Sequence, residues 1–181
     1  TNTTGNAVCN DCPEGKYSTN ENSGGSVSCS PCAPGFFANV PQVPSCCACP
    51  AGRFASASGT VNCLQCPAGK STQGGSAQRD CQPCGRGTYS ENAASLDCTA
   101  CPVGRYADVT GLSQCRSCDV GKHQDVQGQS SCKECGVGTS NSNTDRAQCQ
   151  QCIAGKSANT TGKIECDRCP PGRFSSAGAL A

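Results

Sequence analysis

The chain has 181 residues and a formal net charge of +1, with 14 basic and 13 acidic residues, 21 cysteines and neither Trp nor Met. Three Tyr and four Phe are its only aromatic residues. Such a chain cannot bury enough apolar surface to offset the entropy of ordering its backbone, which argues against an ordinary globular domain. Because the charges are scattered singly, we expect no polyanion-binding face and no nucleic-acid partner.

The number and regular spacing of the cysteines predict covalent stapling in an oxidising compartment, hence an extracellular or cell-surface protein. No apolar run approaches the length of a membrane span, and no signal peptide precedes Thr1. The chain is therefore interpreted either as beginning after processing or as a segment of a longer protein, and the incomplete last repeat that begins at Cys169 favours the second.

In chain order, residues 1–8 are interpreted as the tail of a preceding repeat, 9–174 as tandem repeats and 175–181 as an incomplete last repeat. The repeating unit is Cys-x-x-Cys-Pro-x-Gly-basic-aromatic, followed by a polar stretch. The step between first cysteines is 17 residues seven times, 18 once and 20 once. A short fixed period is typical of a linear array in which each repeat contacts mainly its neighbours.

Each repeat carries two turn signals. A glycine stands three residues after every second cysteine, from Gly15 to Gly172, which predicts a tight turn with positive φ. Four repeats have a further glycine ten residues after the second cysteine: Gly59, Gly111, Gly128 and Gly162. Two short extended segments and a turn make a hairpin, and no segment has room for helical periodicity. The expected fold is an elongated rod of small disulfide-rich loop and β-hairpin units of about 17 residues, with little helix.

Six of the seven aromatic residues occupy one position, five residues after the second cysteine: Tyr17, Phe37, Phe54, Tyr89, Tyr106 and Phe174. We interpret these rings as packing over the disulfide and turn of their own repeat, in preference to an aromatic binding stripe. The only histidine, His123, shares this position, so a metal-binding or catalytic role for it is disfavoured. The preceding residue is basic in seven repeats, and we expect these side chains to point outward and aid solubility.

The ten Cys-x-x-Cys pairs are predicted to form disulfides. Zinc knuckles use the same spacing, but here the pairs are evenly spaced, Lys and Arg do not cluster, and the loops are typical of secreted proteins. A thioredoxin-like role is disfavoured because the pairs lack a βαβ context. We expect no metal and no cofactor.

The spacing predicts that each second cysteine bonds the next first cysteine. The expected pairs are Cys12–Cys29, Cys32–Cys46, Cys49–Cys63, Cys66–Cys81, Cys84–Cys98, Cys101–Cys115, Cys118–Cys132, Cys135–Cys149 and Cys152–Cys166. Closing loops of this size is worth roughly 3 kcal/mol each in the chain-entropy model. Cys9 and Cys169 are left for partners outside the chain. Spacing alone does not exclude ladders between the first or second cysteines of successive repeats.

Cys47 is an additional cysteine, adjacent to Cys46. It is free, cross-links to another chain, or takes the place of Cys46 in the regular bond. Asn2 and Asn159 begin Asn-Thr-Thr triplets and are predicted to carry N-linked glycans.

The unit Cys-x-x-Cys-Pro-x-Gly-x-[Tyr/Phe]-[Ser/Ala] resembles the ephrin-receptor-like cysteine-rich repeat. The segments Cys12–Tyr17 and Cys101–Tyr106 are also similar to the first small module of tumour necrosis factor receptor cysteine-rich domains. The resemblance covers residues 9–174 and implies a secreted rod of disulfide-stapled repeats. Such repeats occur in receptors, in matrix-like proteins and in flagellar-hair (mastigoneme) proteins of algae and other protists.

The near-uniform step favours a structural role over ligand binding, because ligand-binding ectodomains mix module types. We predict a non-enzymatic extracellular stalk or filament segment that assembles with itself or with other fibre proteins. No nucleophile–base pair, carboxylate dyad or phosphate loop is visible. The alternative is a ligand-binding segment of a receptor, for which the apolar stretch Phe36–Pro44 beside Cys47 is the best candidate.

Overall fold

The computed structural model describes residues 11–20 and 27–177. Two compact units make up the chain. The N-terminal unit comprises Thr1–Pro67 and Thr72–Gln82, and the C-terminal unit comprises Ala68–Ser71 and Pro83–Ala181. We number the repeats 1 to 10 by the second cysteine of each pair, from Cys12 in repeat 1 to Cys169 in repeat 10.

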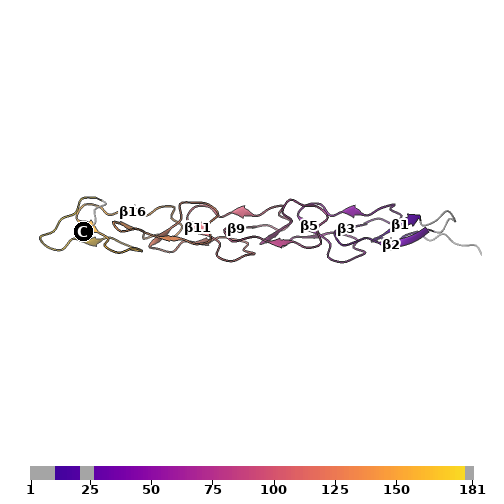
Figure 1. Cartoon of the computed structure of the whole chain (residues 1–181), viewed down its shortest axis with the longest axis horizontal. Helices are drawn as coiled ribbons and strands as arrows, with labels where there is room; N and C mark the ends of the chain where they lie inside the picture. The colour runs from indigo at the N-terminus through magenta and orange to yellow at the C-terminus, as the bar shows by residue number, and fades with distance from the viewer. Residues whose placement is uncertain (1–10, 21–26, 178–181) are drawn as a thin grey trace, which may run out of the picture. The chain divides into compact units, whose positions relative to one another are not determined.

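Short β-strands are the regular secondary structure of the described residues, among which there is no helix (Figure 1). The first two strands have five residues each, β1 (Lys16–Asn20) and β2 (Val27–Pro31). The others have two residues each: β3 (Phe36–Phe37), β4 (Cys47–Ala48), β5 (Arg53–Phe54), β6 (Leu64–Gln65), β7 (Lys70–Ser71), β8 (Gln82–Pro83), β9 (Thr88–Tyr89), β10 (Thr99–Ala100), β11 (Arg105–Tyr106), β12 (Arg116–Ser117), β13 (Lys122–His123), β14 (Lys133–Glu134), β15 (Thr139–Ser140), β16 (Gln150–Gln151), β17 (Lys156–Ser157) and β18 (Asp167–Arg168).

The strands pair as antiparallel hairpins. The strand that follows each turn glycine pairs with the two residues between the next two cysteines. In repeat 6, for example, Arg105 lies opposite Ser117 and Tyr106 lies opposite Arg116. The same pairing joins β1–β2, β3–β4, β5–β6, β9–β10, β13–β14, β15–β16 and β17–β18. The prediction of one small hairpin per repeat with little helix is confirmed.

A turn opens each hairpin, and its glycine has positive φ in all ten repeats, from 75° in Gly121 to 90° in Gly35. The residue after the glycine closes the turn by donating its N–H to the carbonyl three residues back, as Arg105 does to Pro102 at 3.1 Å. A φ in this range is the region that glycine enters without steric cost. The predicted turn is therefore confirmed, and it forms both where its first residue is proline, as at Pro102, and where it is not, as at Asp119.

Backbone hydrogen bonds connect each repeat to the next one in chain order. In the C-terminal unit, the turn-glycine N–H of Gly104 in repeat 6 donates to the Gln124 carbonyl of repeat 7 at 2.7 Å. The Gln124 N–H in turn donates to the Arg146 carbonyl of repeat 8 at 3.0 Å. The same bonds recur along both units, for example Gly35 to Ala55 at 2.8 Å. Each repeat is thus hydrogen-bonded to the repeat before it and to the repeat after it.

Contacts also reach the second repeat along. A Cβ added to Gly104 of repeat 6 would overlap the carbonyl oxygen of Asp145 in repeat 8, and a Cβ on Gly121 would overlap that of Gly162. The glycine is therefore required twice, for its φ and for the close approach of another backbone. Only the φ requirement is visible in the sequence of a single repeat.

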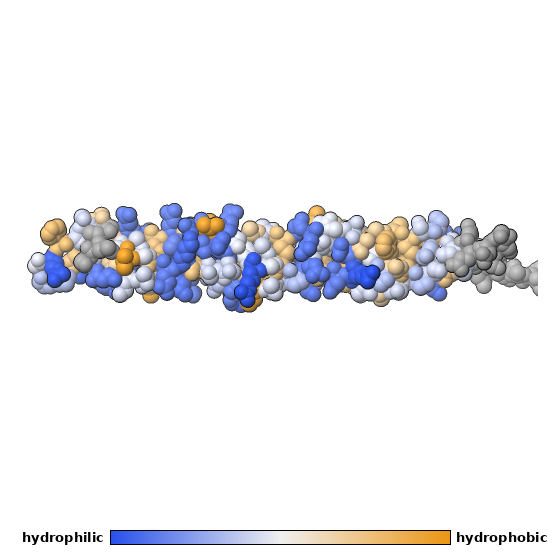
Figure 2. Space-filling model, in the orientation of Figure 1, coloured by the Kyte–Doolittle hydropathy of each residue, from blue (hydrophilic) through white to orange (hydrophobic). Residues whose placement is uncertain are grey.

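The buried side chains are cysteines and small residues. Nine second cysteines, from Cys12 to Cys152, are at most 3% exposed. The position six residues after the second cysteine, which we call the small position, is also buried. It is occupied by Ala38, Ala55, Thr72, Ser90, Ala107, Gln124, Asn141, Ala158 and Ser175. Large hydrophobic side chains such as Ile153 and Leu64 remain exposed, and the face shown in Figure 2 has small separate apolar patches among hydrophilic residues.

The described residues contain no helix that is both long and apolar enough to span a bilayer.

Candidate functional site

The cysteines come together at the joints between repeats, where each second cysteine is bonded to the next first cysteine. The nine bonds have Cα–Cα distances between 5.4 and 5.8 Å. They are Cys12–Cys29, Cys32–Cys46, Cys49–Cys63, Cys66–Cys81, Cys84–Cys98, Cys101–Cys115, Cys118–Cys132, Cys135–Cys149 and Cys152–Cys166. No ladder between like cysteines occurs among the described residues.

Three cysteines fall outside this pattern. Cys9 lies outside the described residues. Cys47 is exposed and unbonded beside Cys46, which keeps the regular bond. Cys169 is partly buried and unbonded within the described part of the chain, with its Sγ 3.3 Å from Ser175 Oγ.

The residues at the ring position, five after the second cysteine, lie against the disulfide of the following repeat. Phe37 packs on Cys49 and Cys63, and Tyr89 packs on Cys101 and Cys115. Our expectation that each ring covers the disulfide of its own repeat is therefore wrong. The backbone bonds that draw one repeat onto the next bring the ring over the next disulfide.

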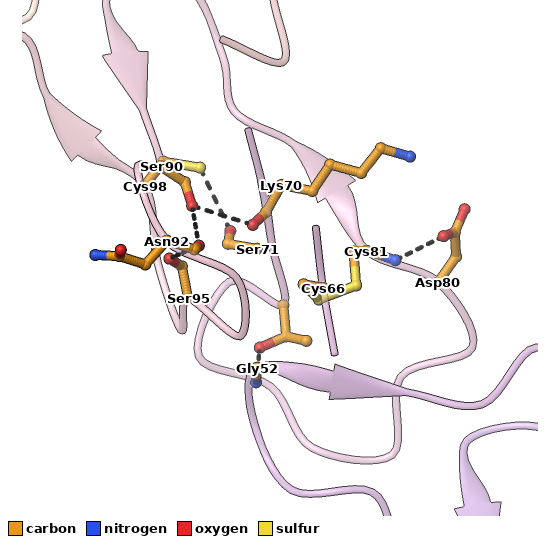
Figure 3. The surroundings of a disulfide bond; sticks show 11 residues. Gly52, Cys66, Lys70, Ser71, Asp80, Cys81, Ser90, Asn92, Ser95 and Cys98 are labelled. Carbon is orange, nitrogen blue, oxygen red and sulfur yellow. Dashed lines mark hydrogen bonds between the residues drawn. A yellow bond between two sulfur atoms is a disulfide. The ribbon is translucent and has the colours of Figure 1, made fainter. Parts of the chain in front are cut away.

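Smaller residues at the ring position make the same contact. Ser71 Oγ lies 3.4 Å from Cys98 Sγ (Figure 3), and Ser140 Oγ lies 3.2 Å from Cys166 Sγ. Phe174, in repeat 10, is 93% exposed, and the described residues contain no following disulfide against which it could pack.

His123 occupies the ring position of repeat 7, and its Nδ1 lies 3.3 Å from Cys149 Sγ. One nitrogen of His123 and the sulfurs of Cys135 and Cys149 all lie within 4.8 Å of one another. These two sulfurs are bonded to each other, so they offer no thiolates to a metal ion.

Three equivalent open grooves lie at joints within the C-terminal unit. One wall of each groove is formed by the residue at the ring position of one repeat and the residue two positions after it. The other wall is formed by the next repeat, through the basic residue that follows its turn glycine and the first cysteine to which its second cysteine is bonded. The residues that they share are Tyr89, Glu91, Arg105 and Cys115 in the first groove, Tyr106, Asp108, Lys122 and Cys132 in the second, and Ser140, Ser142, Lys156 and Cys166 in the third. The lining residues given for these three grooves include no histidine and no free thiol.

The basic residues are less exposed than expected. Arg105, Lys122 and Lys156 are partly buried because they line these grooves. The guanidinium of Arg105 also bonds Asp145 of repeat 8, with Nε 3.1 Å from Oδ1 and Nη2 3.2 Å from Oδ2. This ion pair supports the same long-range contact as the turn glycine.

Other ion pairs lie across single hairpins. Arg116 bonds Asp108 at 2.7 Å in repeat 6, and Lys133 bonds Asp125 at 2.7 Å in the equivalent place of repeat 7. The hydrogen bond from Lys133 holds the pKa of Asp125 below its ordinary value. These pairs are largely exposed, so each contributes little to stability.

The predicted acceptor Asn159 is exposed, as glycosylation requires. In the same triplet, the Thr161 hydroxyl donates to Glu134 Oε2 at 2.9 Å. Asn2 lies outside the described residues.

The small position was not singled out as a buried site by sequence reasoning. Where it holds a larger polar residue, the side chain adds a hydrogen bond to a backbone carbonyl. Asn141 Nδ2 donates to the Lys122 carbonyl at 2.6 Å, and Gln124 Nε2 donates to the Ser131 carbonyl at 2.6 Å. A signal was available, since this column contains only small or hydrogen-bonding residues in all ten repeats.

Comparison with known families gives a match to part of the chain. Residues 72–111 and 104–145 match the family described as tyrosine-protein kinase ephrin type A/B receptor-like. These overlapping segments lie in the array of joints described above. No curated protein matches the chain.

Proposed function

The chain carries ephrin receptor-like cysteine-rich repeats in residues 72–145, and from this premise we propose that it is a segment of an extracellular structural protein. In this proposal it forms part of a stalk or filament, has no enzymatic activity, and assembles by self-association. Flagellar-hair proteins are one class of fibre to which such a segment would belong.

The observation that carries the proposal is the repetition of one surface. The grooves at successive joints combine the same positions, and the interrepeat hydrogen bonds recur in both units. Whatever contact one repeat makes with a partner, the next repeat can make again. Repeated weak contacts add through effective concentration, so assembly needs no strong single contact.

We assign the contact to a row of exposed apolar side chains at the turn, two residues after the second cysteine. Val103, Val120 and Val137 occupy this position in three consecutive repeats and are 41%, 37% and 44% exposed. Other repeats have Ala or Pro there, with Glu14 and Arg86 as the exceptions. A second copy has the same period and can therefore match this row along its length. A contact that does not close on itself gives a filament.

Sedimentation velocity of the oxidised chain over a wide range of concentrations tests the proposal. We expect concentration-dependent association of the wild type. The triple variant Val103→Ser, Val120→Ser and Val137→Ser should associate much more weakly, since each substitution removes up to about 1 kcal/mol of apolar burial at the interface. Val109→Ser with Val126→Ser is the matched control, because these valines are equally exposed, at 43% and 49%, but lie outside the row.

A monomeric wild type at every concentration would contradict self-association. Equal weakening by the control would contradict the assignment to the turn row while leaving self-association in place.

A second candidate function is a ligand-binding segment of a receptor. It is favoured by one irregular place, repeat 2, where Phe36 precedes Phe37 in β3, Val40 is 51% exposed and the additional Cys47 lies opposite Phe37. Binding of a soluble protein that is lost on Val40→Ser, by a chain that stays monomeric alone, would establish this function instead.

A further inference from the structure

We propose that the Cys135–Cys149 disulfide is a modification site, the bond of this array that small thiols open most readily, and that His123 makes it so. This inference is independent of the proposed function. It rests on a joint where, among the described residues, a histidine side chain touches the disulfide.

The imidazole of His123 is placed to interact with both sulfurs. Its Nδ1 is 3.3 Å from Cys149 Sγ, and one of its nitrogens lies within 4.8 Å of Cys135 Sγ as well. Elsewhere in the array the ring position holds Tyr, Phe or Ser, none of which carries positive charge. Cys149 is partly buried, whereas Cys135 is fully buried, so an incoming reagent meets Cys149 first.

A thiolate of a small dithiol attacks Cys149 Sγ and forms a mixed disulfide, while the Cys135–Cys149 bond breaks and its electron pair leaves on Cys135 Sγ. The second thiol of the reagent, as thiolate, then attacks the reagent sulfur of the mixed disulfide and releases Cys149 as a thiolate. The reagent is oxidised to its cyclic disulfide, and the protein gains two thiols.

A protonated imidazole favours the first step, because negative charge is spread over the sulfurs during attack and then rests on the leaving thiolate. Histidine changes its charge between about pH 5 and 8, so the advantage grows as the pH falls. The charged neighbours are Asp125, whose carboxylate interacts with His123, and Lys133, which lies opposite His123 and pairs with Asp125.

Two disulfides serve as internal references. Cys84–Cys98 and Cys152–Cys166 enclose the same 14-residue separation as Cys135–Cys149. Their first cysteines are partly buried like Cys149. Their ring positions hold Ser71 and Ser140, which contact the sulfurs at 3.4 and 3.2 Å. Cys84–Cys98 is the stricter reference, because its contacting side chain is a neutral serine, whereas Cys166 also shares a groove with the charged Lys156.

The experiment measures site-resolved reduction. Free thiols of the oxidised chain are first capped with iodoacetamide, and the protein is then exposed briefly to limiting dithiothreitol at several pH values. After an acid quench, new thiols are labelled with N-ethylmaleimide and quantified by peptide mass spectrometry. The readout is the ratio of opening at Cys135–Cys149 to opening at the two references, which cancels the titration of the reagent.

We expect this ratio to be about four or more at pH 5.5–6 and to fall toward one near pH 8. A factor of about four is the rate increase expected when two opposite unit charges 4.8 Å apart attract each other in water. In His123→Ser, which makes this joint equivalent to the references, the ratio should be near one at every pH. The proposal would be overturned by a wild-type ratio near one at low pH. It would also be overturned if the ratio stayed raised in His123→Ser, because the faster opening would then be due to the accessibility of Cys149.

Discussion

Replacing a single turn glycine tests whether the repeats are held together by backbone packing between repeats 6 and 8. Gly104→Ala introduces a methyl group at a φ of +79°, where it would overlap the Asp145 carbonyl oxygen. Gly155→Ala introduces the same group at a φ of +80° with nothing within 4 Å. Both glycines donate their N–H to the small position of the next repeat, so the two variants share this hydrogen bond and differ in packing.

The expected magnitudes follow from the positive φ that both positions share and from their difference in packing. An alanine at positive φ costs about 1–2 kcal/mol, and this cost applies to both variants. Overpacking adds about 1–3 kcal/mol at Gly104, because the obstructing atom is backbone and cannot turn aside as a side chain could. We therefore expect Gly104→Ala to be less stable locally than Gly155→Ala by about 1–3 kcal/mol.

Native-state hydrogen exchange followed by mass spectrometry measures this difference, since it resolves the free energy of local opening repeat by repeat. Peptides from repeats 6 and 8 should both lose protection in Gly104→Ala. In Gly155→Ala, the loss should be smaller and confined to repeats 9 and 10. Equal loss of protection in the two variants, or loss in repeat 6 with none in repeat 8, would refute the argument for contact between alternate repeats.

Four further predictions concern shape, bonding, modification and charge. Small-angle scattering of the oxidised chain should give a radius of gyration of about 30 Å, as for a rod on the order of 100 Å, against ~16 Å for a globule of this length. A non-reducing peptide map of the native protein should contain Cys101–Cys115 and its eight equivalents; peptides joining Cys101 to Cys118 would indicate a ladder. Mass spectrometry of native material should find glycans on Asn2 and Asn159, and bare asparagines at both would contradict the assignment. In Lys133→Met, NMR titration should show the pKa of Asp125 returning toward its ordinary value. Because that pKa is lowered in the folded chain, the small stabilisation of the fold by the Lys133–Asp125 pair is present above about pH 4 and is lost as acid protonates the carboxylate.

Repeat period and turn chemistry were readable from the sequence because both are local. The turn at Gly104 needs only the residues from Pro102 to Arg105, and the hairpin needs only the polar stretch between Tyr106 and Cys115. The expected cysteine pairing is local in the same sense, since each bond closes a loop of 14 residues in most repeats. These features would form in almost any arrangement of neighbouring repeats.

The contacts between repeats could be seen only in three dimensions. Nothing near Tyr89 in the sequence indicates that its ring lies on the disulfide of the next repeat, and nothing near Gly104 indicates Asp145, 41 residues later. The same holds for His123: its position is that of a packing ring, yet the next repeat supplies the disulfide that its imidazole touches.

The sequence by itself therefore determined the unit: its length, its two turns, its hairpin and its covalent staple, all of which depend on residues within one period. The packing contacts between one repeat and the next were decided by the tertiary structure alone. A repeat this small has no core of its own, so its ring, its small position and its turn glycine are completed by the next repeat and the one after.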